Sequence, residues 1–447
     1  MASVCITPAR EAAFSALIAC EKQGAWSDQA IQVAAKKNNL SSRDAALAST
    51  ICYGILQNRI LLDYWIDCYS KTPCTKLDRE VRLALRMGLY QLHFLDRIPD
   101  NAAVNESVNL VRKYARNKSA SGLVNAVLRA FQRAGGSLPK PSCSYEEQLS
   151  IFYSHPLDLI RLLSEQLNKG EIEALLSADN TPVDTFVQVN TLKVTTIELA
   201  QVLARSGADA SVHPWMPDCL SVRHIGDIEK LPEFQAGSFY VQDCAAKLAA
   251  MISGAEPGCN VLDACAAPGG KSFAAGILMK NRGCIISCDL QEKKLVRINR
   301  GAARLGLDII ASQCADGRIF HPEWERRFDV VLADVPCSGL GIIRKKPDIR
   351  YKDLEAIKSL PGIQYDILQN VERYVKPGGV LVYSTCTVLK RENEAVIDDF
   401  LLAHNEFECE DFILPEGTMS KNGMLTLWPH IHGTDGFFMA KLRRKHD

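Results

Sequence analysis

The sequence lacks the patterns that mark three common protein classes. Its 16 cysteines include no C-x-x-C pair, and the closest repeat is Cys284 with Cys288. Zinc sites and secreted disulfide frameworks need short, repeated cysteine spacings, so we expect no metal and a reducing compartment. The longest uncharged stretch, residues 45–58, is shorter than the ~18 residues that suggest a membrane span. Arg10 and Glu11 precede any sustained apolar run, unlike in a signal peptide. We therefore expect a soluble, cytoplasmic protein with no membrane partner.

Net charge is also absent, because 52 Lys and Arg balance 52 Asp and Glu. With 447 residues and 47% hydrophobic side chains, the chain is long enough for about three domains and too apolar for a disordered tail protein. The charge is nevertheless uneven. Residues 1–140 carry 19 basic and 11 acidic side chains, which leaves 33 basic and 41 acidic ones in the rest. A basic front segment indicates where a nucleic acid would bind.

Residues 1–138 have the pattern of an all-α domain. Apolar residues recur at helical spacing in segments 78–95, 104–115 and 121–131, and no alternating strand pattern intervenes. The opposite faces of the first two segments carry arginines, of which Arg82, Arg86 and Arg112 are our candidates for RNA contacts. A solvated helix face is the alternative interpretation of these arginines. Residues 135–141, rich in glycine and proline, predict a linker.

The remainder divides into two further segments. Residues 139–235 combine a helix at 157–167, a strand at 185–190 and a helix at 197–205, which predicts a small α+β module. From residue 236 to 447, short apolar strands alternate with helices, as in a parallel, Rossmann-like α/β sheet covered on both faces. The five predicted strands are 260–264, 284–289, 309–314, 328–333 and 380–384. Ligands of such sheets bind at the carboxyl ends of the strands.

The strongest local signal is residues 261–272, Val-Leu-Asp-Ala-Cys-Ala-Ala-Pro-Gly-Gly-Lys-Ser. A strand, a glycine turn and a helix start suit an anionic ligand group. The turn lacks the dinucleotide pattern G-x-G-x-x-G, and Cys265 stands where a P-loop has its first glycine. S-adenosylmethionine is the third interpretation. It is favoured by Asp289, about 20 residues on, which could accept from ribose hydroxyls, and by Asp316 at the next strand end, within reach of an adenine.

Two cysteines follow the last two predicted strands. Residues 334–341 read Asp-Val-Pro-Cys-Ser-Gly-Leu-Gly and residues 383–387 read Tyr-Ser-Thr-Cys-Thr. Cysteine is often only a small buried hydrophobe, but Cys337 and Cys386 stand where a nucleophile would be placed. A methyl donor, a thiolate and the carboxyl group of Asp334 together match methylation of cytosine carbon 5, which needs a thiolate on carbon 6. Spacing alone does not tell which thiol attacks.

The sequence closely resembles the RNA 5-methylcytosine methyltransferases, and among them the RsmB (Sun, Fmu) group, which modifies small-subunit ribosomal RNA. The front half resembles a NusB-type RNA-binding domain, in which residues 125–129 are among the familiar ones. The other matching stretches are 240–243, 263–271, Asp289, Asp316, 334–341, 384–387 and 435–440.

The resemblance implies the roles of the site residues. Cys386 would be the nucleophile, Cys337 would assist release of the methylated base, and Asp334 would hold the cytosine edge. S-adenosylmethionine would be the cofactor, and the substrate would be one cytidine of 16S rRNA, free or in an assembling small subunit, with the enzyme acting as a monomer. The cofactor would be bound by Cys265, Ala266, Ala267, Pro268, Gly269, Gly270, Lys271, Asp289, Asp316 and Asp334.

Two departures and two alternatives accompany this interpretation. The group usually has an arginine where Gln188 stands and often a tryptophan where Asp158 stands, which leaves the RNA contacts of the middle module in question. Methylation of another RNA, such as a tRNA or another rRNA site, is one alternative. A non-catalytic RNA-binding assembly factor is the other, and intact Cys337, Cys386 and Asp334 argue against it.

Overall fold

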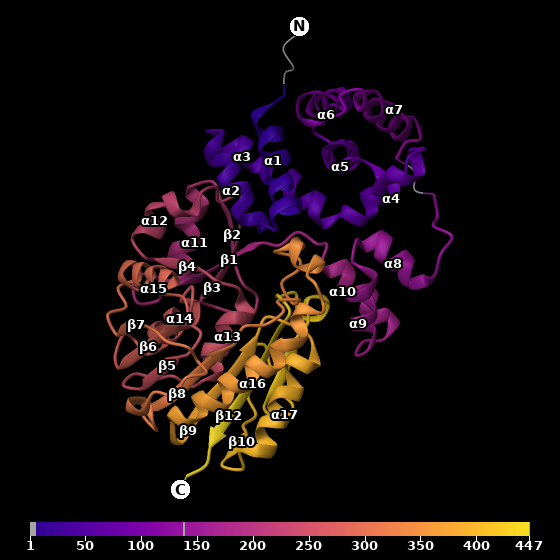
Figure 1. Ribbon diagram of the computed structural model, residues 1–447. Coiled ribbons are helices and arrows are strands. Elements are labelled where there is room, and N and C mark those ends of the chain that lie inside the picture. The colour runs from indigo at the N-terminus through magenta and orange to yellow at the C-terminus, as the bar shows by residue number, and fades with distance from the viewer. Residues whose placement is uncertain (1–5, 137–138, 447) are drawn as a thin grey trace. The chain divides into compact units, whose positions relative to one another are not determined.

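The computed structural model describes residues 6–136 and 139–446, and the chain divides into two compact units (Figure 1). The helical unit comprises Met1–Asn180 together with Lys345–Lys352, and the sheet unit comprises Thr181–Arg344 and Asp353–Asp447. Part of the predicted linker, residues 137 and 138, lies outside the described residues. The domain boundaries at residues 138 and 235 stay predictions.

Among the described residues of 1–138, all the regular structure is helical, as predicted. The helical unit also includes three helices from the range predicted as the α+β module, residues 139–235. Its first seven helices bury one continuous apolar core, to which α5 contributes Val81, Leu85 and Leu89 at the expected spacing. Its helices are α1 (Pro8–Gln23), α2 (Ser27–Lys37), α3 (Ser42–Gln57), α4 (Arg59–Tyr69), α5 (Arg79–Phe94), α6 (Asp100–Tyr114), α7 (Ala120–Arg133), α8 (Tyr145–Tyr153), α9 (Leu157–Ser164) and α10 (Lys169–Ala178).

Local sequence explains where several helices begin. A Ser, Thr or Asn at the N-cap accepts from the third helical N–H, and a glutamate at that third position accepts from the N-cap N–H. These reciprocal pairs are Ser144 with Glu147 at α8, Asn168 with Glu171 at α10, and Thr195 with Glu198 at α11 (Thr196–Arg205). Each pair satisfies backbone donors that the helix itself leaves without partners.

The segment Lys345–Lys352 belongs to the helical unit although the chain on both sides belongs to the sheet unit. Its Arg350 is 1% exposed and its guanidinium donates to the carbonyls of Gln57, Tyr153 and Ser154 and to Oδ1 of Asn180, at 2.9 to 3.3 Å. These acceptors lie at or just beyond the C-terminal ends of α3, α8 and α10. Carbonyls at helix ends carry partial negative charge, so they stabilise a buried cation that has no carboxylate partner.

The sheet unit begins with the predicted α+β module. Its antiparallel sheet has the order β2-β3-β1-β4, with strands β1 (Thr185–Val189), β2 (Asp209–Val212), β3 (Cys219–Arg223) and β4 (Phe239–Val241). Helix α11 packs Leu199 and Leu203 against Val187 and Leu220 of the sheet. The sequence predicted β1 and α11, whereas β2, β3 and β4 are too short and irregular in pattern to be recognised.

The main sheet has the order β10-β12-β9-β8-β5-β6-β7, with β11 paired to β12 (Figure 1). The five strands from β9 to the edge strand β7 are parallel and are those predicted: β5 (Asn260–Asp263), β6 (Cys284–Asp289), β7 (Ile310–Cys314), β8 (Phe328–Asp334) and β9 (Val375–Thr385). The sequence missed the antiparallel strands β10 (Phe407–Cys409), β11 (Met424–Leu427) and β12 (Phe437–Arg444).

Alternating strand residues bury both faces of the main sheet, as expected of a central parallel sheet. On β8, Val331 and Ala333 share a core with α16 (Leu360–Val371) and α17 (Glu394–Ala403). Val330 and Leu332 face the opposite core, with α13 (Cys244–Ile252) and α14 (Gly270–Leu278). Helix α15 (Glu292–Leu305) packs on α14. The predicted Rossmann-like α/β fold is therefore confirmed.

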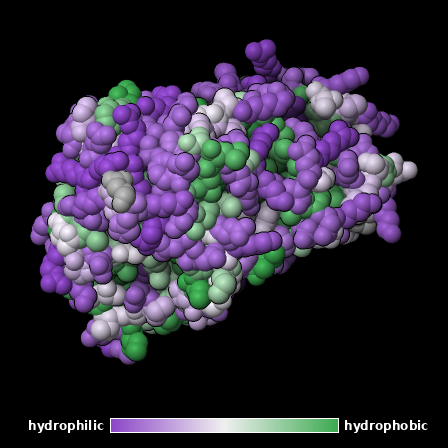
Figure 2. All heavy atoms as spheres, turned by 90° about the horizontal axis from the view of Figure 1, so that it is seen from below, coloured by the Kyte–Doolittle hydropathy of each residue, from purple (hydrophilic) through white to green (hydrophobic). Residues whose placement is uncertain are grey.

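The surface is mainly polar. Most of the face in Figure 2 is hydrophilic, and its hydrophobic residues form several separate patches. Among the described helices, none alone has the length and apolar composition to cross a membrane. Helices α3 and α4 meet those criteria only as a pair, which is bent by 77°.

Candidate active site

Two cysteines from neighbouring strands meet at the carboxyl edge of the main sheet. Strands β8 and β9 are parallel, with Asp334 opposite Ser384, so the segments that follow them leave the sheet side by side. Cys337 comes three residues after β8, and Cys386 follows β9 directly. Their Sγ atoms are 3.3 Å apart, and both side chains are half-buried. The two candidate nucleophiles of the sequence therefore form one site.

A buried carboxylate joins the segments that carry the two thiols. Glu392 is 0% exposed, and its Oε2 accepts from the backbone N–H of Ser338 at 2.8 Å and from Gln364 Nε2 at 3.0 Å. The Ser338 hydroxyl lies 2.7 Å from that of Thr387. Ser338 and Thr387 directly follow Cys337 and Cys386, so these bonds hold both cysteines in register. Sequence reasoning did not single out Glu392, because a glutamate in a helical-looking stretch usually faces solvent.

The hydrogen bond between the two sulfurs affects the titration of Cys337. The hydrogen bond to the Cys386 sulfur, followed by burial, raises the pKa of the Cys337 thiol well above its usual 9.0, and the negative charges of Glu392 and Asp334 add to the effect. Cys337 therefore keeps its proton at neutral pH. A protonated Cys337 can donate to a thiolate on Cys386, which is the arrangement that an attacking Cys386 requires.

An ion pair lies beside the thiols. Lys271 Nζ is 2.6 Å from Asp334 Oδ2, and the Ser384 hydroxyl donates to Asp334 Oδ1 at 2.9 Å. The Lys271 side chain is only 9% exposed, whereas that of Asp334 is 30% exposed. We had expected Lys271 in the cofactor turn, but its side chain reaches the carboxylate at the end of β8. The pair combines a proton donor and an acceptor within one site.

The predicted glycine turn connects β5 to α14. Gly269 has a φ of +111°, and a Cβ there would lie 2.5 Å from the Phe273 ring. A Cβ on Gly270 would lie 2.8 Å from Nε2 of Gln242. Position 269 therefore needs a glycine, whereas a side chain at 270 would require the end of Gln242 to move. The turn exposes backbone amides at the start of α14 to an anionic group.

Asp263, at the end of β5, is fully buried below this turn. Its Oδ2 accepts from the Ser272 hydroxyl at 2.6 Å, while Oδ1 has no partner among the described residues. Burial raises the pKa of Asp263 to about 6, although the Ser272 hydrogen bond and the Lys271 charge both lower it. The carboxyl group of an unfolded chain titrates near 3.8.

This difference predicts a pH effect on stability. The folded protein binds one more proton than the unfolded chain between about pH 4 and 6, so the contribution of Asp263 to the unfolding free energy falls as pH rises through that window. Asp263→Asn removes the titration. We expect the unfolding free energy of the variant, relative to wild type, to rise by about 2 to 3 kcal/mol from pH 4 to pH 7. Urea unfolding at several pH values measures the difference, and a pH-independent difference contradicts the prediction.

Two further acidic residues end neighbouring strands, as predicted. Asp289 ends β6, is 7% exposed, and accepts from the backbone N–H of Gln291 at 2.9 Å. The next residue, Leu290, is 62% exposed and apolar. Asp316, two residues after β7, forms two hydrogen bonds with the guanidinium of Arg318. A turn of free amides, a carboxylate for ribose hydroxyls and an apolar side chain for a purine ring fit S-adenosylmethionine.

Comparison with known proteins matches most of the chain. The model of the family "16S rRNA methyltransferase RsmB/F" matches residues 250–443, the NusB family model residues 7–133, and the RsmF/B-like ferredoxin-like domain residues 155–229. The probable ribosomal RNA small subunit methyltransferase B of Bacillus subtilis (strain 168) is 36% identical, over 98% of this chain and 99% of its own. The chain belongs to the RsmB/F family of 16S rRNA methyltransferases. The resemblance to the RsmB group with a NusB-like front domain is thus confirmed.

Other relatives agree with this membership in the RsmB/F family. The ribosomal RNA small subunit methyltransferase B of Vibrio cholerae (El Tor Inaba N16961) is 32% identical over 98% of both chains. The solved structure of PH0851 is 28% identical, with a TM-score of 0.82 over 98% of this chain and 99% of its own. That of a methyltransferase homolog from Pyrococcus horikoshii is also 28% identical, with a TM-score of 0.58 over 68% of this chain and 99% of its own.

Membership in the RsmB/F family makes this protein an S-adenosylmethionine-dependent methyltransferase, as predicted. We expect Asp289→Ala to weaken cofactor binding about 10- to 100-fold, because a hydrogen bond to a charged acceptor contributes about 1.5 to 3 kcal/mol. RNA affinity should change much less. Calorimetry with each ligand measures both, and Asp308→Ala, which removes an exposed carboxylate just before β7, is the matched control. Equal losses for cofactor and RNA contradict the ribose role of Asp289.

The structure corrects one expectation about this RsmB/F methyltransferase's arginines. Arg86 is 4% exposed, so the prediction that it faces solvent is wrong. Its guanidinium pairs with Asp63, at 2.6 Å, and with Glu21, because α4 and α1 place these carboxylates against it. Arg112 is exposed and Arg82 is partly so. RNA binding by any of them stays a prediction.

The two departures from the family pattern lie in different places. Gln188 is 0% exposed and donates to the Gln242 carbonyl at 2.9 Å and to the Cys219 sulfur at 3.3 Å. Gln188 is therefore an interior side chain of the α+β module rather than an RNA contact. Asp158 is exposed in the first turn of α9, in the helical unit, where a carboxylate suits the positive end of a helix.

The prediction of no metal site stays open. Among the described residues, Glu372, His404 and Glu406 offer three ligand atoms within 4.8 Å of one another. The carboxylate of Glu372 also lies 3.5 Å from the guanidinium of Arg444, so this potential ligand already has a cation beside it.

Proposed function

We propose that this protein methylates carbon 5 of one cytidine in 16S rRNA through a covalent adduct with Cys386. One observation supports this most: the Cys337 and Cys386 sulfurs lie 3.3 Å apart, beside the Lys271–Asp334 ion pair. Adenine or ribose methylation needs no thiol, whereas cytosine carbon 5 needs a nucleophile on carbon 6 and a proton at the ring nitrogen. The names of the relatives supply the rRNA, and by resemblance the target is the cytosine numbered 967.

The first step is addition to the ring. The Cys386 thiolate forms a bond to carbon 6, the electrons of the 5,6 double bond move toward N3, and N3 takes a proton that the Lys271–Asp334 pair holds at the base edge. Carbon 5 becomes an enamine carbon with nucleophilic character. Bound S-adenosylmethionine supplies an electrophilic methyl group for it. The base must first leave its stack, which costs a few kcal/mol that the RNA contacts offset.

The second step is release, and here the second thiol acts. While Cys386 is a thiolate, its charge keeps Cys337 protonated. Once Cys386 has become a neutral thioether, that charge is gone, and the pKa of Cys337 falls. Cys337 then loses its own proton to solvent water and takes the proton from carbon 5. The 5,6 double bond reforms, the Cys386 sulfur leaves with the bonding electrons as a thiolate, and N3 returns its proton to the Lys271–Asp334 pair.

Site mapping tests the proposed function directly. Purified protein is incubated with S-adenosylmethionine and with unmethylated 16S rRNA, assembling small subunits or tRNA, and each RNA is then sequenced after bisulfite treatment. We expect one protected cytidine in the 16S RNA and none in tRNA. Protection only in tRNA, or methyl incorporation without bisulfite protection, would reject the proposal.

A further inference from the structure

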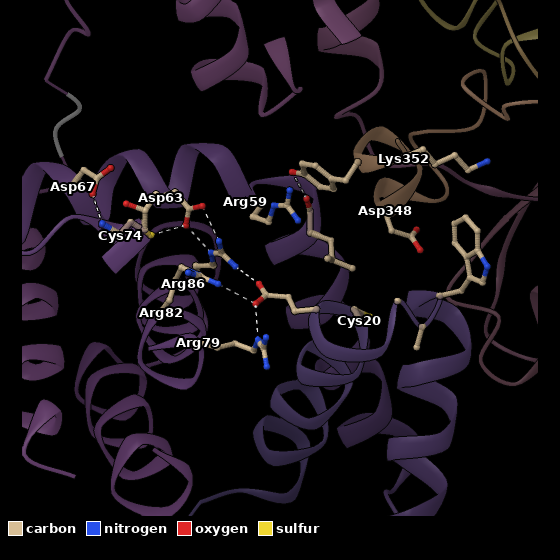
Figure 3. A pocket seen from close by; sticks show the side chains of 17 residues that line it. Cys20, Arg59, Asp63, Asp67, Cys74, Arg79, Arg82, Arg86, Asp348 and Lys352 are labelled. Atoms are coloured by element: carbon tan, nitrogen blue, oxygen red, sulfur yellow. Dashed lines mark hydrogen bonds and ion pairs between the residues drawn. The ribbon is translucent and has the colours of Figure 1, made fainter. Parts of the chain in front are cut away.

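The helical unit contains an open cavity of about 670 Å³ that the methylation chemistry does not use. Helices α1, α4 and α5 and the segment Lys345–Lys352, all within that unit, contribute its walls. Figure 3 shows Arg79, Arg82 and Arg86 together on one side, Asp348 on the other, and Arg59 between them. Its size is in the range of sites that hold a small molecule or one unit of a polymer.

The arginine side of the cavity has hydrogen-bond donors to spare. Within the described chain, neither the Arg59 nor the Arg79 guanidinium donates a hydrogen bond, and Arg79 forms an ion pair of 3.8 Å with Glu21. Arg82 Nε is buried without a partner. Unused guanidinium donors at a cavity wall are suited to a phosphate, which they can bind in a bidentate manner.

The acids on this side are already engaged. Asp63 accepts from two nitrogens of Arg86 and from the Cys74 thiol, and Asp67 accepts from the Cys74 backbone N–H. Glu21 has three arginines around it. The carboxylates therefore hold Arg86 in place, and the remaining donors of the other arginines point to an anionic ligand.

The other side of the cavity carries aromatic rings and a hydrogen-bond acceptor. Trp26, before α2, is 44% exposed, although tryptophan is usually well covered. Asp348 accepts from the Ser27 backbone N–H through Oδ2, but its Oδ1 is buried without a partner. Tyr351 is covered by the Arg59 guanidinium, 3.6 Å above its ring. This side thus offers a flat apolar surface and a free acceptor.

We propose that this cavity binds one nucleotide of a single-stranded RNA segment. A nucleotide joins a phosphate, a flat ring and ring-edge N–H donors in one unit, and the cavity offers guanidinium donors, Trp26 and Asp348 Oδ1 to match. The assignment rests on the proposed function in that the RNA is the substrate. It extends that function with an RNA contact in the helical unit, separate from the methylated base.

Binding measurements with the full-length protein test the cavity. The anisotropy of a fluorescent single-stranded RNA gives its Kd at several salt concentrations. We expect Trp26→Ala to raise Kd about 5- to 150-fold, as loss of one base stack does. Arg79→Glu should raise it about tenfold and reduce the salt slope by about 0.7. Arg133→Glu, an exposed reversal at the end of α7, is the matched control and should have a smaller effect. If both cavity variants bind like this control, the proposal is overturned.

Crosslinking provides a second readout that folding defects do not imitate. Ultraviolet irradiation of the wild-type complex should attach a nucleotide to the peptide that contains Trp26 or Tyr351. Crosslinks confined to other peptides overturn the proposal, as does tight binding of free cytidine monophosphate or of an acidic peptide that RNA does not displace. RNA binding is measured without methylation. Loss of RNA affinity in Arg79→Glu, without methylation by the wild type, would reject the proposed function and keep the cavity.

Discussion

Cys386→Ala is expected to abolish methylation, by at least about 10,000-fold, because the nucleophile has no substitute. The variant should also form no covalent RNA adduct, since in the proposed mechanism the Cys386 sulfur bonds to carbon 6. Transfer of a tritiated methyl group measures the first effect. A denaturing gel of protein with labelled RNA measures the second.

The companion variant, Cys337→Ala, should behave in the opposite way on the gel. Under the proposed mechanism it retains the attacking thiolate but lacks the group that takes the carbon 5 proton, so adduct should accumulate while turnover falls. Cys68→Ala, which removes an exposed thiol of the helical unit, is the control and should resemble wild type. If Cys337→Ala gave no adduct and Cys386→Ala accumulated it, the two roles would be reversed.

The second large effect concerns the Lys271–Asp334 pair. Asp334→Asn keeps the shape of the side chain but removes the charge that holds Lys271, whose side chain is almost fully buried. Because the proposed mechanism uses this pair to protonate N3, kcat should fall about 100- to 10,000-fold. Lys271→Met should have a similar effect, and the double variant should lose little more than either single one, since residues that act as a unit are not additive.

The same strand offers a matched control. Asp329, near the start of β8, pairs with Lys376 at the same distance of 2.6 Å, but both side chains are 36% exposed. Asp329→Asn removes an ion pair of equal length from the opposite end of β8, and kcat should stay within about twofold because exposed pairs contribute little. Single-turnover rates at saturating RNA and cofactor compare the variants. Similar losses in both would show that Asp334 only stabilises the fold.

The sequence predicts which edge of the sheet carries the candidate site, because the candidate residues come at or directly after the ends of recognisable strands. Asp289 and Cys386 each end or directly follow a strand whose apolar run is evident, and parallel strands present those ends on one edge. The sequence pattern does not reveal which strands pair, and so it does not show that β8 and β9 are neighbours. Hence the 3.3 Å separation of Cys337 and Cys386 could not be deduced from spacing.

Long side chains, and a strand that follows the α/β alternation, account for the features that the sequence did not predict. Lys271 belongs to the glycine turn in sequence, but its long side chain places the ammonium group beside Asp334. The direction of a flexible side chain cannot be predicted from the sequence pattern. Arg86 has the spacing of an exposed face, and only the partners from α1 and α4 bury it. Strand β12 pairs antiparallel with β9 after the α/β alternation has ended, so that alternation did not predict it.

Arg350 has a consequence for the order in which the chain becomes structured. The carbonyls of Gln57, Tyr153 and Ser154 receive their cation from a residue that is synthesised about 170 positions after the last helix of that unit. A fragment that stops at Asn180 would leave the Gln57 carbonyl without this cation, whereas the Tyr153 carbonyl would keep its hydrogen bond from Asn180 Nδ2. The nascent helical unit therefore completes its interior only when residue 352 has emerged from the ribosome. A helical unit excised after Asn180 would therefore lack Arg350 unless the segment Lys345–Lys352 were supplied in trans.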